Sequence, residues 1–189
     1  MLSTRPPRQR ELLDQLVALF LAEGFRHFTL AELADRLRCS KSTLYAFGES
    51  KEQVTVSVVI EFFRRATVAV EQATAAGADP PARLVAYLRA VARALRPASA
   101  AFMADLSEST PTAAVYAHNT EAAAGRVRAL VEEGIAAGSF RSVHGAFVAE
   151  VVAATMRRIQ TGELVAATGL HDADAYDALA DLILNGVRS

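Results

Sequence analysis

Cysteine is nearly absent from this chain, and its scarcity limits the chemistry available to the protein. Cys39 is the single cysteine among 189 residues. An internal disulfide framework and a multi-cysteine zinc site are therefore excluded, and a reducing, cytoplasmic location is expected. Cys39 itself is expected to be a small buried turn residue, because redox sensing would require a lowered thiol pKa.

Long apolar runs and clustered catalytic residues are missing as well. No segment approaches the roughly 18 uncharged apolar residues of a membrane span. The basic residues near the N-terminus are not followed by an apolar run long enough for a signal peptide. The histidines are scattered, and no nucleophile stands in a recognisable turn. We therefore expect no membrane partner, no metal, no cofactor and no enzymatic activity.

Lysine occurs only twice, at Lys41 and Lys51, although the chain holds 20 lysine and arginine residues. Residues 1–51 contain eight basic and six acidic side chains, whereas the remainder contains 12 basic and 15 acidic ones. The net charge of −1 thus conceals a slightly basic N-terminal segment. Such a segment is a place to look for an anionic partner.

Apolar residues recur at helical spacing almost everywhere, and period-two alternation is nearly absent. The first two stripes are Leu12, Leu16, Leu19 and Phe20, then Leu30, Leu33, Ala34 and Leu37. Glycine and proline clusters divide the chain into about nine helices, short at first and long later. The sequence predicts an all-α protein with an N-terminal domain at 1–50 and a larger helical domain at 51–189.

Helix-start signals define the first domain. Thr29–Glu32 and Ser50–Gln53 both match the capping box, and Ser40 can cap a helix between them. Helices are expected up to Glu23, over 30–37, over 41–47 and over 51–75. Two short helices joined by so brief a turn are typical of the helix-turn-helix, whose second helix enters the DNA major groove.

A helical wheel predicts which side of the second short helix faces outward. With Leu44 directed to the core, Ser42 and Ala46 point away from it, flanked by Lys41, Thr43 and Tyr45. Hydroxyls can bond base edges, and alanine can touch a thymine methyl group. Lys41, Tyr45 and Lys51 would then reach phosphates. The alternative is that this face is simply a solvated polar surface.

The stretch LFLAEGFRHFTLAELADRLRCSKSTLYAFGESKEQV, residues 19–54, resembles the DNA-binding domain of the tetracycline-repressor (TetR) family of bacterial regulators. The resemblance implies a homodimer on a pseudo-palindromic operator, with a divergent helical domain that binds a small molecule and releases DNA. It also implies DNA contacts at Thr29, Lys41, Ser42, Thr43, Tyr45 and Lys51, to which we add Arg38 and Ala46 as candidates.

Two positions depart from the family pattern. Arg38 stands where the family commonly has glycine, and it would be strained if its φ is positive. Phe47 and Gly48 replace the usual histidine and phenylalanine. We expect Phe47 to turn inward and Gly48 to end the helix in a left-handed conformation.

The second domain is expected to hold the effector and the partner subunit. The predicted ligand-binding residues are Phe62, Phe63, Tyr87, Phe102, Met103, Leu106, Tyr116 and Asn119, with Asp105, Glu108 and His118 as further polar candidates. They suggest a largely apolar or aromatic ligand. Any one of these aromatics can equally be plain core.

Two apolar helix faces near the C-terminus predict the dimer interface. They comprise Phe147, Val148, Val151, Val152, Thr155, Met156 and Ile159, then Tyr176, Leu179, Leu182, Ile183 and Val187. The resemblance to the TetR family implies that these helices pair with their two-fold copies as a four-helix bundle. The alternative is that both faces cover only their own subunit.

The sequence thus favours a DNA-binding transcriptional regulator, expected to be a repressor released by a ligand. Two other classes are weighed against it. A helical small-molecule sensor that has lost operator binding is suggested by Phe47-Gly48 and the nearly neutral first domain. A helical enzyme would need a convergent set of titratable residues, which the sequence does not show.

Overall fold

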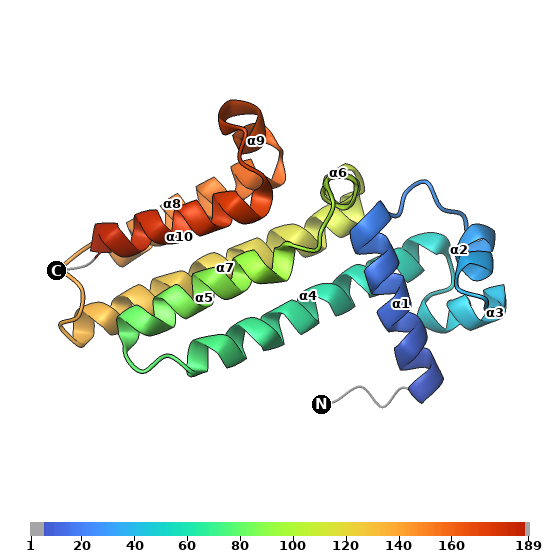
Figure 1. Ribbon diagram of the computed structural model, residues 1–189, viewed down its shortest axis with the longest axis horizontal. Helices are drawn as coiled ribbons and strands as arrows, with labels where there is room; N and C mark the ends of the chain where they lie inside the picture. The colour runs from blue at the N-terminus through green and yellow to red at the C-terminus, as the bar shows by residue number, and fades with distance from the viewer. Residues whose placement is uncertain (1–5, 188–189) are drawn as a thin grey trace. The chain divides into compact units, whose positions relative to one another are not determined.

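Helices make up nearly all of the computed structural model, which describes residues 6–187. No strand occurs among the described residues, so the all-α prediction is confirmed. The elements are α1 (Pro7–Glu23), α2 (Leu30–Arg36), α3 (Lys41–Leu44), the 3₁₀ turn η1 (Tyr45–Phe47), α4 (Lys51–Ala75), α5 (Pro80–Leu95), α6 (Ala100–Glu108), α7 (Thr110–Ala136), α8 (Gly145–Gln160), α9 (Glu163–Thr168) and α10 (Asp172–Val187) (Figure 1).

The helices form two compact units. The first combines Met1–Arg64 with Ala98–Val115, and the second combines Arg65–Pro97 with Tyr116–Ser189. The first unit therefore includes α6, which lies far along the chain from α1 to α3. This division does not follow the expected boundary at residue 50, and a separate 1–50 domain stays a prediction.

The core of the first unit is rich in phenylalanine. Phe25 packs against Phe20 at 5.5 Å between ring centroids and against Phe102 of α6 at 5.9 Å. Phe62 of α4 meets the same Phe102 ring edge-on at 5.7 Å. Edge-to-face contacts of this kind add to the gain from burying aromatic surface. One ring of α6 therefore joins the turn after α1 to α4.

The second unit is built around α5, α7, α8 and α10. Helix α10 packs along α5 and against α8 (Figure 1). Glu71 of α4 binds Arg126 of α7 at 3.0 Å, and the Tyr87 hydroxyl of α5 donates to the Ala123 carbonyl at 3.3 Å. Burial is the main cause that raises the pKa of Tyr87 well above its usual range.

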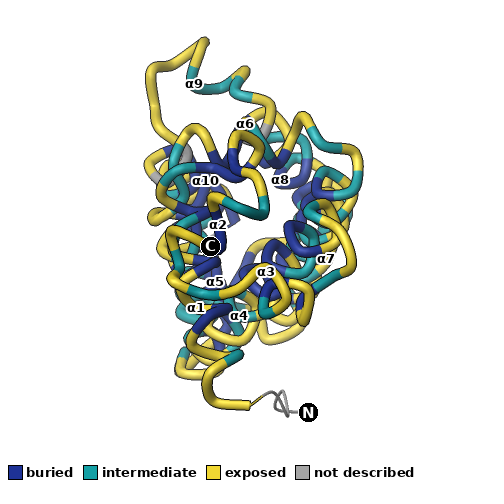
Figure 2. The backbone as a smooth tube through the Cα atoms, turned by 90° about the vertical axis from the view of Figure 1, so that its right-hand side faces the viewer, coloured by how far each residue is buried: buried dark blue, intermediate teal, exposed yellow. Residues whose placement is uncertain are grey.

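The short helix α9 is the element that raises the count from about nine helices to ten α-helices in the described chain. It lies between Gly162 and Gly169, both left-handed with φ 74°. None of its residues is buried, and the α9 segment shows no dark blue in Figure 2. Because a period of 3.6 needs a longer run to be recognised, so short a helix gave no signal of its own.

Caps place the helices of the first unit as the sequence predicts. The Thr29 hydroxyl accepts from Glu32 N while Glu32 accepts from Thr29 N, so this capping box is confirmed. Ser40 caps α3 by accepting from Thr43 N at 3.2 Å. At α4, Ser50 accepts from Gln53 N, but the Gln53 side chain accepts from Glu49 N instead of Ser50 N.

Gly48 is not the left-handed helix end that the sequence suggested. Its φ is 165° and its ψ is 152°, which is extended backbone. A Cβ at this position would lie 2.6 Å from Gln53 Cβ and 2.7 Å from Val54 N. Glycine is therefore needed because the backbone here approaches the first turns of α4, and not because of φ. The prediction for Phe47 is confirmed, since its side chain is buried.

Candidate nucleic-acid interface

Helix α3 presents the outward face that the helical wheel predicted. Leu44 is fully buried, with 0% of its surface exposed. Around it the side chains that reach solvent are Lys41, Ser42, Tyr45 and Ala46, with Thr43 half-buried. The exposed residues are small or polar, apart from Tyr45, whose ring carries a hydroxyl. This arrangement permits contact with base edges and phosphates, while the DNA contacts themselves stay a prediction.

Three hydroxyls meet at the start of α3. Ser40 Oγ lies 2.7 Å from Ser42 Oγ and 2.8 Å from Thr43 Oγ1. The two hydroxyls predicted to read bases are therefore already hydrogen-bonded in the free protein. Binding to DNA would exchange these bonds for bonds to bases, so each base contact would contribute only the difference between the two.

Arg38 has the positive φ that would make its conformation strained. Its φ is 50°, and no other non-glycine residue described has a positive φ. The side chain is exposed, and its guanidinium makes no ion pair with another described residue. Arg26 and Arg36, by contrast, are paired with Glu108 and Glu23. The guanidinium of Arg38 is thus available to bind an anionic partner, as is the ammonium of Lys41.

Cys39 follows Arg38 and is half-buried. Burial raises the pKa of its thiol, with Arg8 acting in the opposite direction. A raised pKa reduces the thiolate fraction, and thiolate is the reactive form. This agrees with a structural role.

Lys51 is turned toward its own chain. Its Nζ donates to the Arg26 carbonyl at 2.6 Å, and the side chain is half-buried. Burial is the largest cause that lowers the pKa of Lys51, whereas the carboxylates of Asp105 and Glu32 act against it. Thr29 is likewise occupied by its capping bonds. For both residues a DNA contact stays a prediction and would require these bonds to be shared or broken.

Of the residues predicted to hold a ligand, seven of eight are buried, and Asn119 is half-buried. Five belong to the first compact unit, and Tyr87, Tyr116 and Asn119 belong to the second. Among the further polar candidates, Asp105 and Glu108 bond within their own unit to the segment after α1. His118 is exposed. A cavity lined by this set stays a prediction.

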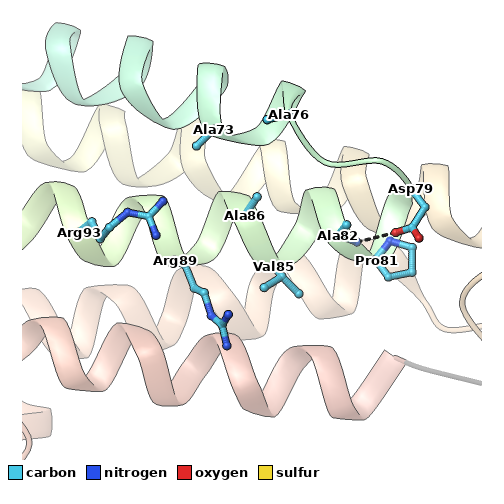
Figure 3. A pocket seen from close by; sticks show the side chains of 9 residues that line it. All are labelled: Ala73, Ala76, Asp79, Pro81, Ala82, Val85, Ala86, Arg89 and Arg93. Atoms are coloured by element: carbon cyan, nitrogen blue, oxygen red, sulfur yellow. Dashed lines mark hydrogen bonds between the residues drawn. The ribbon is translucent and has the colours of Figure 1, made fainter.

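Two open grooves of the second unit are lined by other residues. One, of about 690 Å³, lies along α4 and α5, where Ala73 and Ala76 face α5 and Arg89 points away from α4 (Figure 3). The other, of about 710 Å³, lies between α7 and α8 and has Ala124 and Ala153 in its walls. Both are within the size range of ligand sites, but neither includes a residue that the sequence singled out.

Most side chains predicted to face a partner subunit are covered within their own chain. The buried ones are Val148, Val152, Met156, Ile159, Tyr176, Leu179, Ile183 and Val187. Val151 and Thr155 are half-buried, whereas Phe147 and Leu182 expose 67% and 68% of their surface. The exposed large apolar side chains of this set are therefore Phe147 and Leu182.

No helix within residues 6–187 combines the length and the apolar character that a bilayer span needs. Among the same residues, no group of three or more histidine, cysteine or acidic side chains is placed to hold a metal ion.

Comparison with solved structures shows which known fold the chain has. The chain superimposes over its length on TetR/AcrR-family regulators. One from Thermobifida fusca has 20% identity and a TM-score of 0.67, covering 97% of this chain and 100% of that one. One from Agrobacterium tumefaciens has 17% identity and a TM-score of 0.69, covering 96% and 98%. This chain has the TetR-family fold.

A further structure with this fold is the fatty acid degradation regulator of Bacillus halodurans, with 15% identity, a TM-score of 0.72 and coverage of 97% and 98%. No protein-family model and no curated protein sequence matches the chain. The resemblance drawn from residues 19–54 is thus confirmed at the level of the fold. At these low sequence identities the similarity shows a shared fold and does not show a shared function.

Asp105 on α6 has a structural contact that sequence reasoning did not predict. It was a candidate for ligand binding, but its carboxylate accepts hydrogen bonds from the backbone just after α1. Because 80 residues separate Asp105 from Phe25, no local pattern could have revealed this contact. Gly24 lies in the stretch 19–54 that resembles the TetR family, but its close approach to Asp105 was not predicted.

Proposed function

We propose that this protein is a sequence-specific DNA-binding transcriptional regulator of the TetR type. The observation that carries the proposal is the outward side of α3 and η1. Lys41, Ser42 and Tyr45 are exposed there, whereas Leu44 on the opposite side is fully buried. Arg38 adds an unpaired positive charge just before the helix. A short helix with a firmly packed inner side and a small, polar outer side suits insertion into the major groove.

A homodimer is the second part of the proposal. One short helix reads few base pairs, whereas two half-sites about 34 Å apart multiply the specificity. A two-fold contact through α8 and α10 is supported by Phe147 and Leu182, which are the most exposed large apolar side chains described and lie on two helices that pack against each other. The operator would then be pseudo-palindromic.

Control by a small molecule is the third part. Release of the operator by a largely apolar or aromatic effector is supported by the TetR-type fold and by the buried apolar residues that α4 and α6 contribute to the first unit. Ligand binding would favour a conformation in which the two recognition helices no longer match successive major grooves. By thermodynamic reciprocity, operator DNA should weaken effector binding by the same factor.

The first experiment is binding of the purified protein to a labelled fragment of its own upstream DNA, with an unrelated fragment of equal length as control. Specific binding should be at least about 10³-fold tighter than nonspecific binding and should weaken steeply with salt. Two protomers should bind per site. Equal affinity for both fragments, followed by a random-sequence selection that enriches no site, would exclude the proposal.

The alternative is a helical sensor that has lost operator binding. It is favoured by Lys51, whose ammonium is bonded to the Arg26 carbonyl, and by Phe47, which is buried where the family pattern has a polar residue. An enriched site in the selection would exclude this alternative. A selection without any enriched site, combined with saturable small-molecule binding, would support it.

A further inference from the structure

The turn between α1 and α2 is held by a carboxylate from a distant helix. Asp105 Oδ2 on α6 accepts from Phe25 N at 2.6 Å and from Arg26 N at 2.9 Å. Both donors lie after the end of α1 and before the start of α2, so no helix supplies them with an acceptor. Bonds from backbone N–H groups to an ionised carboxylate are stronger than those between neutral groups.

Gly24 makes this contact possible. Its φ of 80° is in the region that favours glycine, and a Cβ there would lie 2.6 Å from Asp105 Oδ2. The Ala101 backbone is the next obstacle, at 3.3 Å from that Cβ. Glycine is required twice at this position, once for the backbone conformation and once for the close approach of α6.

Other contacts of α6 fix the same segment. Ser99 N donates to the Leu21 carbonyl at 2.8 Å, so the last turn of α1 is also joined to the start of α6. The Phe102 ring packs edge-on against Phe25. An exposed ion pair joins Arg26 to Glu108 and is expected to contribute little by itself. The Asp105 carboxylate is therefore the main polar contact of α6 with the turn.

The peptide groups of Arg26 are held from two sides. Its N–H donates to Asp105, and its carbonyl accepts from Lys51 at the start of α4. Asp105 also lies within electrostatic reach of the Lys51 ammonium. The turn is thus fixed between α6 and α4, and α2 begins only four residues after Arg26. Since α2 packs against α3, the conformation of this turn sets where the recognition helix lies.

We propose that Asp105 is a positioning residue for DNA binding, which acts by fixing the Gly24–Arg26 turn and through it α2 and α3. The inference rests on the proposed DNA-binding function. Asp105 touches no DNA in this scheme, so its removal should lower operator affinity without removing a phosphate contact. The number of phosphates neutralised, which sets the salt dependence of binding, should stay the same.

Three variants test the contact. Asp105→Ala removes both bonds to the turn. Asp105→Asn keeps an acceptor oxygen where Oδ2 stands but loses the charge. Gly24→Ala leaves Asp105 in place but pushes its carboxylate away from the turn. Glu121→Gln on α7 is the control for the loss of one negative charge, because Glu121 is exposed and makes no hydrogen bond or ion pair with another described residue.

The readouts are operator affinity over a range of salt concentrations and amide hydrogen exchange at Phe25 and Arg26. Asp105→Ala and Gly24→Ala should each bind about tenfold more weakly, roughly the net effect of losing one hydrogen bond. Their salt slope should equal that of the parent protein, and both amides should exchange faster. Asp105→Asn should recover most of the affinity, and Glu121→Gln should bind as the parent does.

Several outcomes would overturn the inference. Asp105→Ala could bind as tightly as Glu121→Gln, or Asp105→Asn could be as weak as Asp105→Ala, which would make charge rather than geometry the cause. A salt slope that differs by about one from that of the parent protein would make Asp105 part of the charge balance at the interface. If Asp105→Ala does not fold, the operator affinity and amide exchange of Gly24→Ala and Asp105→Asn test the inference instead.

Failure of the proposed function has a different signature. In that case the parent protein itself binds no operator, and the positioning role falls with it. Amide exchange at Phe25 and Arg26 still shows whether Asp105 holds the turn, because this measurement needs no DNA.

Discussion

Hydrogen bonds of short and long range fix the conformation of the first unit: Thr29 and Ser40 cap their own helices, whereas Asp105 binds the turn after α1. The capping roles of Thr29 and Ser40 were predicted because donor and acceptor lie within three residues of each other. The reason for glycine at Gly48 was missed, because its close neighbours belong to the next helix. The contact of Asp105 with the turn after α1 was missed for the same reason, since its partners are 79 and 80 residues away.

Arg38 permits a test that separates strain from DNA binding. Arg38→Gly should relieve the cost of a side chain at φ 50°, about 1–2 kcal/mol, against a loss of about 0.5–1 kcal/mol from the freer unfolded chain. The free energy of unfolding should therefore rise by about 0.5–1 kcal/mol in urea denaturation. Operator affinity should fall, with a salt slope smaller by about one if Arg38 neutralises a phosphate.

Arg38→Lys is the matched control for this variant. It keeps the charge and the Cβ, so neither stability nor the salt slope should change much. An unchanged salt slope in Arg38→Gly would remove Arg38 from the set of DNA contacts.

At the scale of elements, the long helices and their caps were predicted well. Helix α4 runs from Lys51 to Ala75 as expected, because the Ser50 hydroxyl caps its start and a glycine-proline segment follows it. The segment 41–47, predicted to be one helix, is less regular than expected. It is an α-helix only over Lys41–Leu44 and continues as the 3₁₀ turn Tyr45–Phe47. Buried Phe47 and the close approach at Gly48 are tertiary constraints on this end, which local propensity does not contain.

The glycines Gly48 and Gly125 offer an opposed pair of predictions for element packing. Gly48→Ala would place a Cβ 2.6–2.7 Å from Gln53 and Val54, so the end of η1 or the start of α4 must shift. Gly125 lies inside α7 with nothing within 4 Å of an added Cβ. Gly125→Ala should therefore stabilise the protein by about 0.5–1 kcal/mol through helix propensity.

Thermal unfolding of both variants checks this pair. Gly48→Ala should lower Tm and Gly125→Ala should raise it. A Gly48→Ala variant as stable as the parent would mean that the backbone there yields easily, and that glycine at this position has no packing role.

At the scale of the whole molecule, the sequence shows that a helix face is apolar but not what covers it. Of the twelve residues predicted to form the dimer interface, eight are buried in the chain itself. The alternative that these faces cover their own subunit therefore accounts for most of them. Phe147 and Leu182 differ, because both remain largely exposed once the chain has folded. A helical pattern alone could not separate the two groups, since both have the same periodicity.

The dimer proposal can be tested at Leu182, which exposes 68% of its surface. Leu182→Glu should leave the fold intact, because an exposed side chain contributes little to the folded monomer. At the centre of a two-fold interface it would bury two carboxylates near each other, and the dissociation constant should rise at least about 30-fold, the scale of a loss of 2 kcal/mol at an interface hot spot. Sedimentation at several concentrations measures this change.

Val68→Glu is the matched control, because Val68 is apolar and 48% exposed but lies on α4, away from α8 and α10 in sequence. It should remain a dimer and keep its operator affinity. Leu182→Glu should lose operator affinity together with dimerisation, because each monomer then holds a single half-site. If Leu182→Glu sediments as the parent does, α10 does not form the two-fold contact. If both proteins are monomers that still bind a palindromic site tightly, recognition does not depend on a preformed dimer.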